Sequence, residues 1–477
     1  MANEALLREI TEFCRANGMA DSTFGRLAVN DGKFVGRIRD GGRVTPPTLE
    51  RVRAYIASRS GSNGASGEPD ALSRRAALPP SSARPLAAPG APPLAGPARS
   101  SEEALQRSFR FFDNRQKYLL FVHTCSEKRV IAQRVSLELA NLHPRPPAVR
   151  VFDAGVGDGT VLTIVLRAMH RRFPTMPFYA VGKEISLEDV RLTLEKMPDR
   201  FYEHPGMVLV LTNLYYREAP WLRPNSVTSA TSLVWHKLAL AGGTSHEFEQ
   251  QIAGLDGFLA EHWRAHVSPN TGNPVYERPA VLVIYRADHR FLLDPIIPKR
   301  GGAQADYDLV IASQPYRARA PLDFKVSKVI APLAMSLGPG GRVLAVHSHG
   351  RDPGLEIVQG VWPDENPFQH DRHDMLKAIK AALGGAARDF NFNAYADSRS
   401  LFRYHMHALP TEVASAIGTS TLFAAWNAAI YVGQIEDARL DSVVGSRRHL
   451  DVTAEVLHRH GGLWFWDESY IISRHRG

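Results

Sequence analysis

Three apolar runs in the middle of the chain each end in a side chain that can form hydrogen bonds: Asp153, Glu184 and Asn213. Such runs predict buried strands, and the carboxyl ends of parallel strands meet at the edge of a sheet where ligands bind. An acidic residue at the end of the second strand can accept both ribose hydroxyls of a nucleoside. We therefore expect Glu184 to contact a ribose and Asn213 to meet the adjoining adenine.

The turn after Asp153 is rich in glycine, with Gly155, Gly157 and Gly159 between the first strand and the next helix. Without side chains in the way, a ligand can lie against the backbone N–H groups of such a turn. Glycines are common in tight turns, so the weight of this pattern comes from its context. The strand before it and the acid twenty-five residues after it predict a Rossmann-like nucleotide-binding corner.

A fourth apolar run ends in Ser313-Gln-Pro-Tyr316. Along the predicted sheet, Tyr307–Ala312 is the fourth core strand, and a helix follows at about 322–337. Arg342–His347 is then the fifth strand. Ser313, Gln314 and Tyr316 should therefore lie at the same edge of the sheet as the glycine turn.

The segment Asp153–Gly159 resembles motif I of class I S-adenosylmethionine-dependent methyltransferases, and the resemblance covers about residues 148–350. Nicotinamide-binding folds usually place glycine where this strand ends, because the pyrophosphate lies there. S-adenosylmethionine has no phosphate, and its sulfonium and amino groups complement a carboxylate. The resemblance implies that the methionine part lies against Asp153, Gly155 and Gly157, the ribose against Glu184 and the adenine against Asn213.

Ser313-Gln-Pro-Tyr316 resembles the Ser-Pro-Pro-Tyr that amino-directed methyltransferases place beside the methyl acceptor. In those enzymes the first side chain and the next backbone carbonyl accept the amine hydrogens, and the aromatic ring stacks on the base. The resemblance implies these roles for Ser313 and Tyr316. Gln314 replaces the first proline, keeps the carbonyl and adds an amide that can contact substrate. The acceptor, a base amine or another N or O nucleophile, therefore stays open.

The first sixty residues predict four short helices from their apolar spacing and turn signals. The expected helices cover about residues 6–14, 22–29 and 33–40, with a fourth after residue 47. The segment Ser22–Ile38 resembles the helix-turn-helix of the phage-repressor-like DNA-binding family. In this resemblance Ala28 lets two helices cross closely, Gly32 makes the turn, and Ile38 anchors the third helix in the core.

In that family the third helix enters the major groove of DNA. The resemblance therefore implies duplex DNA as a partner, contacted by Lys33, Arg37 and Arg39. Residues 1–60 hold ten Lys and Arg against seven Asp and Glu, a net charge of +3. Because this is a modest charge for a DNA-binding surface, a protein-interaction module is the alternative.

The chain of 477 residues is too long for one compact core, and its composition, with 44% hydrophobic and 22% charged residues, is that of a globular protein. No apolar run approaches the ~18 residues of a membrane span, and the N-terminus lacks a signal-peptide core. Cys14 and Cys125 do not suggest a disulfide framework. We expect a cytoplasmic protein that meets no membrane. Its net charge of +8 is compatible with a polyanionic partner but does not require one.

A stretch dense in Pro, Gly, Ala and Ser, about residues 58–101, predicts a flexible linker. The apolar runs around Asp467-Glu468 suit a closing antiparallel hairpin. The expected organisation is a helix-turn-helix domain at 1–59, a linker at 60–104 and a methyltransferase domain at 105–477, with its core at 148–350, an insertion at 219–279 and a C-terminal helix and hairpin at 400–475. The insertion either shapes the acceptor pocket or is a structural cap.

Three short histidine pairs, at 347/349, 370/373 and 405/407, lack a cysteine or clustered carboxylates at ligand spacing, so no metal site is expected. His347 or His349, just past the fifth strand, can instead act as a general base.

The sequence thus predicts an α/β fold, a Rossmann-like class I methyltransferase sheet preceded by a small all-α helix-turn-helix domain and a disordered linker. The predicted activity is methyl transfer from S-adenosylmethionine to an unidentified N or O acceptor. The alternatives are a transcriptional regulator that senses the cofactor without turnover, and a DNA amino-methyltransferase.

Overall fold

The computed structural model describes residues 2–16, 19–29, 31, 33–39, 44, 46–60, 115–268, 274–407 and 417–476. The chain divides into two compact units, Met1–Leu94 and Ala95–Gly477. Most of the predicted linker and the predicted turn residue Gly32 lie outside the described residues.

The first unit contains the four predicted helices. Their bounds are α1 (Ala2–Ala16), α2 (Asp21–Val29), α3 (Phe34–Arg39) and α4 (Pro46–Ser60). Ala28 and Ile38 are buried in their common core, as predicted. Gly25 is required where α2 meets the following loop, because a Cβ there would lie 2.3 Å from the carbonyl oxygen of Asp31.

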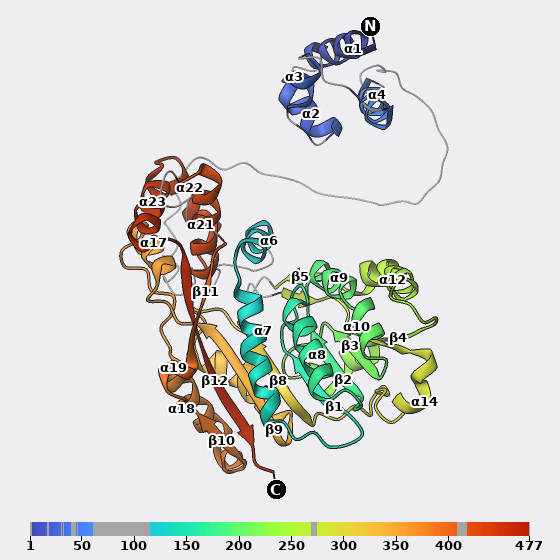
Figure 1. Ribbon diagram of the computed structural model, residues 1–477, viewed down its shortest axis with the longest axis vertical. Helices are drawn as coiled ribbons and strands as arrows, with labels where there is room; N and C mark the ends of the chain where they lie inside the picture. Colours follow the sequence, from blue (N-terminus) through green and yellow to red (C-terminus); the bar gives the residue numbers. More distant parts are fainter. Residues whose placement is uncertain are drawn as a thin grey trace, which may run out of the picture. The chain divides into compact units, whose positions relative to one another are not determined.

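The second unit is built on one ten-stranded sheet in the order β10-β12-β9-β8-β1-β2-β3-β7-β4, with β11 also paired to β12 (Figure 1). The strands are β1 (Val149–Asp153), β2 (Phe178–Lys183), β3 (Met207–Thr212), β4 (Val234–Leu240), β7 (Ala280–Arg286), β8 (Tyr307–Ser313), β9 (Leu337–Ser348), β10 (Phe390–Asn393), β11 (Leu401–His405) and β12 (Trp464–Arg474). The five strands from β3 to β9 are parallel. The predicted α/β class is confirmed, and the predicted fourth and fifth strands are β8 and β9.

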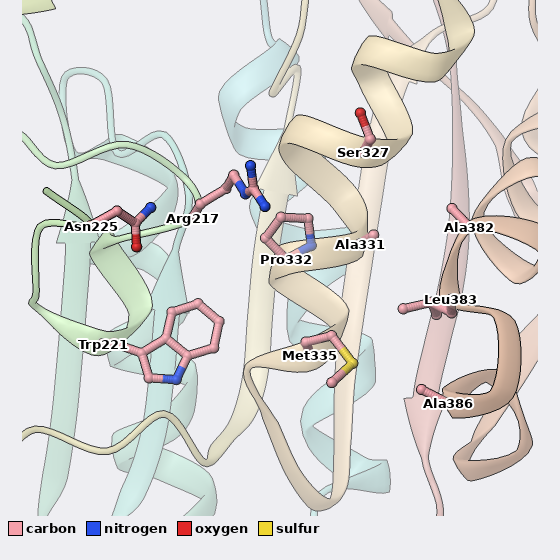
Figure 2. Close-up of a pocket in the computed structure, with 10 residues that line it drawn as sticks. All are labelled: Arg217, Trp221, Asn225, Ser327, Ala331, Pro332, Met335, Ala382, Leu383 and Ala386. Atoms are coloured by element: carbon pink, nitrogen blue, oxygen red, sulfur yellow. The ribbon is translucent and has the colours of Figure 1, made fainter.

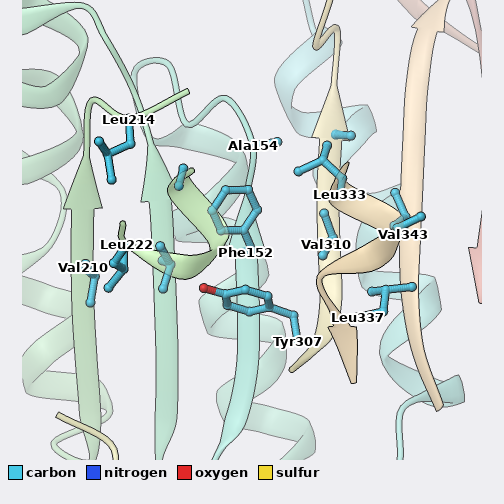
Figure 3. Close-up of a cluster of buried hydrophobic side chains, with 14 of the residues drawn as sticks. Phe152, Ala154, Val210, Leu214, Leu222, Tyr307, Val310, Leu333, Leu337 and Val343 are labelled. Atoms are coloured by element: carbon cyan, nitrogen blue, oxygen red, sulfur yellow. The ribbon is translucent and has the colours of Figure 1, made fainter. Parts of the chain in front are cut away.

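Alternate residues of the central strands enter two separate cores, because side chains in a strand point to opposite faces. In β1, Val149 and Val151 pack on one face and Phe152 on the other. Phe152 meets Tyr307 at a ring-centroid distance of 5.3 Å, among the buried side chains of Figure 3. Burial on both faces explains why these strands appear in the sequence as continuous apolar runs.

Helices cover both faces of the sheet (Figure 1). The helices that contribute to the core containing Val149 are α7 (Glu127–Glu138), α8 (Thr160–Arg172), α9 (Leu187–Glu195), α10 (Pro198–Glu203), α12 (Ser245–Ala253) and α13 (Asp256–His262). The opposite core is covered by α15 (Leu322–Phe324), the π-helical η4 (Lys325–Ile330), α16 (Ala331–Met335) and α18 (Arg372–Leu383). Among the described residues, no helix is both long enough and apolar enough to cross a bilayer.

A third core joins helices from both ends of the second unit (Figure 1). It contains α6 (Arg115–Thr124), α17 (Pro353–Val361), α21 (Thr419–Val432), α22 (Asp437–Val444) and α23 (Arg448–His460). Short elements complete the unit: η1 (Leu139–Asn141), η2 (Ala219–Trp221), α11 (Val227–Ser232), η3 (Ala287–His289), α14 (Arg290–Leu293), η5 (Gly384–Asp389) and α19 (Asp397–Ser400).

The predicted C-terminal hairpin is wrong. The apolar runs around Asp467-Glu468 form the single strand β12, which pairs antiparallel with β9. Its other edge is shared by β11 and β10, and α21 to α23 separate β11 from β12 in sequence. Two adjacent charges suggested a turn, but here both carboxylates stay buried in mid-strand.

The predicted insertion is partly a continuation of the sheet. Its strand β4 pairs parallel with β7, which runs antiparallel to β3. Only the short pair β5 (Ala265–Val267) and β6 (Pro274–Tyr276) forms a separate sheet. The strand β4 therefore extends the sheet beyond β3, while Trp263, also in the insertion, donates a hydrogen bond to the carbonyl of Glu184 at 2.9 Å.

Candidate active site

The strand order changes direction at β1, since β2 and β3 lie to one side of it and β8 and β9 to the other. In open α/β sheets ligands bind outside the carboxyl ends of the strands at this switch point. Asp153 and Ser313 are the last residues of β1 and β8, so the fold brings these two predicted site residues to that point.

Asp153 is 1% exposed, and its carboxylate is only half satisfied. Its Oδ1 accepts a hydrogen bond from the Gly155 N–H at 3.2 Å, whereas no described group bonds to its Oδ2. Burial raises the pKa of Asp153 to about 7; the Gly155 N–H and Lys128 oppose this shift, and Glu184 adds to it. A buried carboxylate oxygen without a partner is costly, which makes this atom a candidate ligand contact.

The three glycines of the turn have different reasons to be glycine. A Cβ on Gly155 would enter open space, so this position is free to receive a ligand. Gly157 has φ +56°, and a Cβ there would lie 3.0 Å from the hydroxyl of Tyr118 on α6. Gly159 has φ +79° and packs against Thr193 of α9. Both of these φ angles favour glycine, because other residues are strained in the left-handed region.

Glu184 holds the glycine turn in place. Its Oε2 accepts the Gly157 N–H at 2.9 Å, and its Oε1 accepts the N–H groups of Ile185 and Ser186 at 2.8 and 2.9 Å. A carboxylate has about four acceptor positions, so these three bonds leave room for a ribose hydroxyl. The predicted ribose contact of Glu184 is therefore compatible with its position and stays a prediction.

The adenine contact predicted for Asn213 needs correction. The Asn213 side chain is 1% exposed; its Nδ2 donates to the carbonyl of Arg278 at 2.9 Å, and its Oδ1 accepts the Ala280 N–H at 2.8 Å. Asn213 thus fastens β3 to the start of β7. Its polar atoms bond to the backbone at the start of β7, the strand that pairs antiparallel with β3. The sequence did not predict this pairing.

The backbone conformation of Gln314 is one that proline cannot adopt. Its φ is +46°, whereas a proline ring fixes φ near −65°, and its N–H donates to the carbonyl of Val346 at 2.9 Å. The resemblance of Ser313-Gln-Pro-Tyr316 to Ser-Pro-Pro-Tyr therefore does not extend to the backbone. The Gln314 amide instead donates to Ser348 Oγ at 3.1 Å and Asp467 Oδ1 at 3.3 Å.

Ser313 keeps the feature expected of an acceptor contact. Its Oγ is buried, and no described group bonds to it. Because it lies at the switch point beside β1, this hydroxyl and Asp153 Oδ2 are two unpartnered polar atoms at the ends of neighbouring strands.

Tyr316 cannot stack on a base as predicted. It is 7% exposed, and its hydroxyl bonds to His347 Nδ1 at 2.8 Å and to the Tyr470 hydroxyl at 3.2 Å. The Nζ of Lys325 lies 5.3 Å from the centre of its ring, within the range of a cation–π interaction. With its hydroxyl engaged and a cation over its ring, Tyr316 is part of the wall and not a free stacking surface.

His347, which the sequence suggested as a general base, is held by a buried carboxylate. Its Nε2 lies 2.7 Å from Glu468 Oε1, and Glu468 also meets His349 and the Arg372 guanidinium, the latter at 3.1 Å. Burial raises the pKa of the Glu468 carboxyl, but His347 and His349 outweigh it and hold this pKa well below its usual range. With both ring nitrogens occupied, His347 orients Tyr316 and has no free nitrogen for a substrate proton.

The sequence did not predict three further candidate site residues: Glu127, Lys128 and Asp467. Asp467 is fully buried, its Oδ2 has no described partner, and burial followed by the charge of Glu127 raises its pKa well above the usual range. Lys128 Nζ lies 3.5 Å from Glu127 Oε2. The charged pair Asp467-Glu468 inside an apolar run was the available signal, but it suggested a hairpin instead.

A separate cavity of about 700 Å³ lies among the turn that holds Trp221, the helix that ends at Met335 and the end of α18 at Leu383 (Figure 2). None of the residues predicted from the sequence lines it, and Arg217 is the charged side chain in its wall. It offers no acid–base pair, so we place the chemistry at the strand ends.

The residues predicted to contact DNA lie at α3 in the first unit. Arg37 and Arg39 have side chains that are 65% and 60% exposed, and they pair with Asp31 and Asp21 respectively. The Lys33 residue is exposed at the start of the helix. Both arginines are accessible, but each already has a carboxylate partner.

No protein-family model and no curated protein sequence matches the chain. In structure the chain is similar to a geranyl diphosphate methyltransferase in complex with GPP and sinefungin, with 11% identity over 72% of this chain and 78% of that chain and a TM-score of 0.28. It is also similar to PKMT2 from Rickettsia typhi in complex with AdoHcy, with 10% identity over 73% of this chain and 52% of that chain and a TM-score of 0.24.

A third similar structure is the rRNA methyltransferase aviRa from Streptomyces viridochromogenes, with 16% identity over 46% of this chain and 73% of that chain and a TM-score of 0.21. Likenesses with TM-scores of 0.28 or lower carry no argument about function. The functional case therefore rests on the glycines and buried carboxylates at the switch point of the sheet.

Proposed function

We propose that the second unit binds S-adenosylmethionine at the switch point between β1 and β8 and transfers its methyl group to an N or O acceptor. The observation that carries the proposal is a pair of buried carboxylates, Asp153 and Asp467, each with one oxygen that no described group contacts. Asp153 is the last residue of β1, and Asp467 pairs with Ser348, the last residue of β9. Both therefore lie at the carboxyl ends of the parallel strands, where ligands of such folds bind.

The residues present fit this cofactor. S-adenosylmethionine carries a sulfonium and an ammonium group. At the ends of β1 and β8 the described residues include the acidic Glu127, Asp153 and Asp467 and the positive charge of Lys128. A cation placed among them would relieve the cost of burying these carboxylates. A nucleotide phosphate would meet the same carboxylates unfavourably, which argues against a nicotinamide cofactor.

Each residue can be given a role on this basis. Asp153 would hold the ammonium or sulfonium end, Gly155 would leave the space beside it, and Glu184 would meet the ribose while supporting the turn. S-adenosylmethionine supplies an electrophilic methyl group with a good leaving group, so little acid–base help is needed. The protein's contribution is chiefly to align the acceptor near Ser313.

The base-amine alternative loses support, because Gln314 and Tyr316 do not adopt the geometry of a Ser-Pro-Pro-Tyr corner. A regulator that only senses the cofactor is distinguished by the absence of turnover. Label transfer from methyl-labelled cofactor to DNA, RNA, protein and small-molecule extracts separates it from an enzyme.

Calorimetry of the full chain with S-adenosylmethionine tests the cofactor assignment. Gly155→Val fills the open space without backbone strain, so we expect it to abolish measurable binding. The matched control is Gly385→Val, since Gly385 is exposed in η5 and also faces open space. Wild-type affinity in Gly155→Val would show that the cofactor does not lie against this turn.

For the first unit we propose duplex DNA as the partner of α3. The packing of α2 on α3 through Ala28 and Ile38, and the exposure of Arg37 and Arg39, support this proposal. The acidic partners of both arginines imply that binding competes with internal ion pairs. Affinity should therefore be weak and sensitive to salt.

A further inference from the structure

A small, partly open cavity lies beside the proposed acceptor position. It has room for about 10 Å³, the space of one water molecule, and its wall includes Gln314, Tyr316, Lys325, Ser348 and His370. Ala318 and Phe368 also line it, so the wall combines apolar surface with the polar groups of Gln314, Lys325 and Ser348. Gln314 lines this cavity and also donates a hydrogen bond to Asp467, one of the carboxylates at the proposed cofactor site.

Lys325 is the unusual member of this wall. It is 2% exposed, and its Nζ donates one hydrogen bond, to the carbonyl of Ala318 at 2.7 Å. Within the described part of the chain no carboxylate pairs with it, and burial lowers its pKa to about 8. A buried ammonium with two hydrogens left over is costly, so the position is electrostatically incomplete.

The local helix geometry places Lys325 here. Residues Lys325–Ile330 form a π-helical segment, and such segments occur frequently at functional sites. Pro332, in the next turn, has no N–H to donate to the carbonyl of Lys328, which accounts for the irregularity. The sequence therefore widens the helix at the point where Lys325 faces Tyr316.

We propose that this cavity receives one oxygen of a carboxylate of the methyl acceptor, with Lys325 as its counter-charge and the Ser348 hydroxyl and Gln314 amide as neighbouring polar groups. This inference rests on the proposed function. The site then has two ends of opposite sign, with Glu127, Asp153 and Asp467 toward the cofactor and Lys325 toward the acceptor. The substrate class is a small molecule whose nucleophilic N or O lies a few atoms from a carboxylate.

Other occupants fit less well. A cationic group would face Lys325 directly. Burial, and after it the charge of Lys325, lowers the pKa of His370, so positive charge is disfavoured at this position. A neutral apolar group would leave the ammonium hydrogens unsatisfied. A phosphate presents the same kind of anionic oxygen to Lys325, so phosphate binding is one of the outcomes that the experiment distinguishes.

Thermal unfolding of the full chain in formate tests the proposal, with formamide as the neutral counterpart and ionic strength held constant with sodium chloride, which carries no carboxylate. We expect formate to raise the wild-type Tm by about 1–3 °C by binding the folded state, and formamide to leave it unchanged. Lys325→Met, similar in volume but uncharged, should abolish the formate response. Lys380→Met, which changes an exposed lysine of α18, should retain it.

If Lys325→Met does not fold, Lys325→Gln keeps a donor for Ala318 and serves the same test. Equal responses to formate and formamide, a formate response that survives both substitutions, or a response to inorganic phosphate but not formate would overturn the proposal. Calorimetry with S-adenosylmethionine on the same samples separates the two hypotheses. Cofactor binding without a formate response rejects only the carboxylate pocket, whereas a formate response without cofactor binding rejects the proposed function.

Discussion

Burial of Asp153 costs stability in the ligand-free protein, and the same carboxylate is proposed to bind the cofactor. Its burial raises its pKa to about 7, compared with about 3.9 for an exposed aspartate, so the ligand-free protein holds a proton there that the unfolded chain would release. The Asp153 contribution to stability therefore falls as pH rises from about 4 to about 7. A cationic ligand reverses the preference, because it favours the ionised carboxylate.

The first prediction concerns this proton. The affinity for S-adenosylmethionine should rise with pH below about 7, by up to tenfold per pH unit, and level off above it, since binding requires ionised Asp153. Asp153→Asn should remove this dependence and weaken binding at pH 7.5 by roughly 10- to 100-fold, the effect of losing a charge-assisted contact. Calorimetry between pH 5.5 and 7.5 measures both. A pH profile in Asp153→Asn identical to that of the wild type would contradict the assignment.

The second prediction concerns the backbone of Gln314. Gln314→Pro should destabilise the protein by at least about 1–3 kcal/mol, because the Val346 carbonyl loses its donor and a proline cannot adopt φ +46°. Gln314→Asn, a residue that tolerates this conformation and keeps the backbone N–H, is the control and should lose less stability than the proline variant. Urea unfolding of the three proteins gives the comparison. Equal stability of the proline variant would mean that the left-handed conformation at this position is not required.

At the scale of elements, β12 does the most to define the site. By inserting antiparallel beside β9 it brings Asp467 next to Ser348 and Glu468 next to His347. Arg372 on α18 then satisfies Glu468 from a different layer. The strand therefore places Asp467, whose Oδ2 has no described partner, at the proposed cofactor site. It places Glu468, whose two oxygens are both bonded, behind Tyr316 and His347.

The third prediction tests this division. Arg372→Met should lower the free energy of unfolding by about 3 kcal/mol, because it removes one partner of a buried ion pair and leaves Glu468 less compensated. Arg459→Met is the matched control: its side chain is 54% exposed and its pairs with Glu356 and Glu455 lie at the surface, so it should cost less than about 1 kcal/mol. Denaturant titrations at pH 7 measure both. Similar losses would show that the Glu468 network adds no more than a surface pair.

At the scale of the whole molecule, the chain joins an all-α unit to an α/β unit, and each has its own core. The proposed activities are separable in the same way. Changes at α3 should affect nucleic-acid binding and leave cofactor binding intact, and changes at the glycine turn should do the reverse.

The fourth prediction is that the full chain binds duplex DNA weakly, and that the double variant Arg37→Ala with Arg39→Ala loses this binding. The control is Arg53→Ala, which removes an exposed arginine of α4 that pairs with Glu9. Fluorescence anisotropy at 20, 50 and 150 mM salt should show affinity that falls steeply with salt in the wild type and the control. No binding by the wild type at the lowest salt concentration would favour the protein-interaction module.

The sequence alone was enough to predict features that depend on neighbours along the chain. Continuous apolar runs indicated β1, β2 and β3, because strands buried on both faces need apolar residues at every position. The turn from Asp153 to Gly159 was predictable because left-handed φ angles and ligand clearance impose glycine locally. Helical spacing likewise predicted the helices of the first unit.

Tertiary structure decided which polar residues are free to act. Asn213 lies at the predicted place at the end of a strand, but its amide is hydrogen-bonded to the start of β7. Lys325, from a helix later in the sequence, covers the ring of Tyr316. Asp467 reaches the site only because β12 returns beside β9 from the far end of the chain. These outcomes depend on contacts between distant segments, and a pattern of residue types specifies where a strand ends but not which partner will occupy its last side chain.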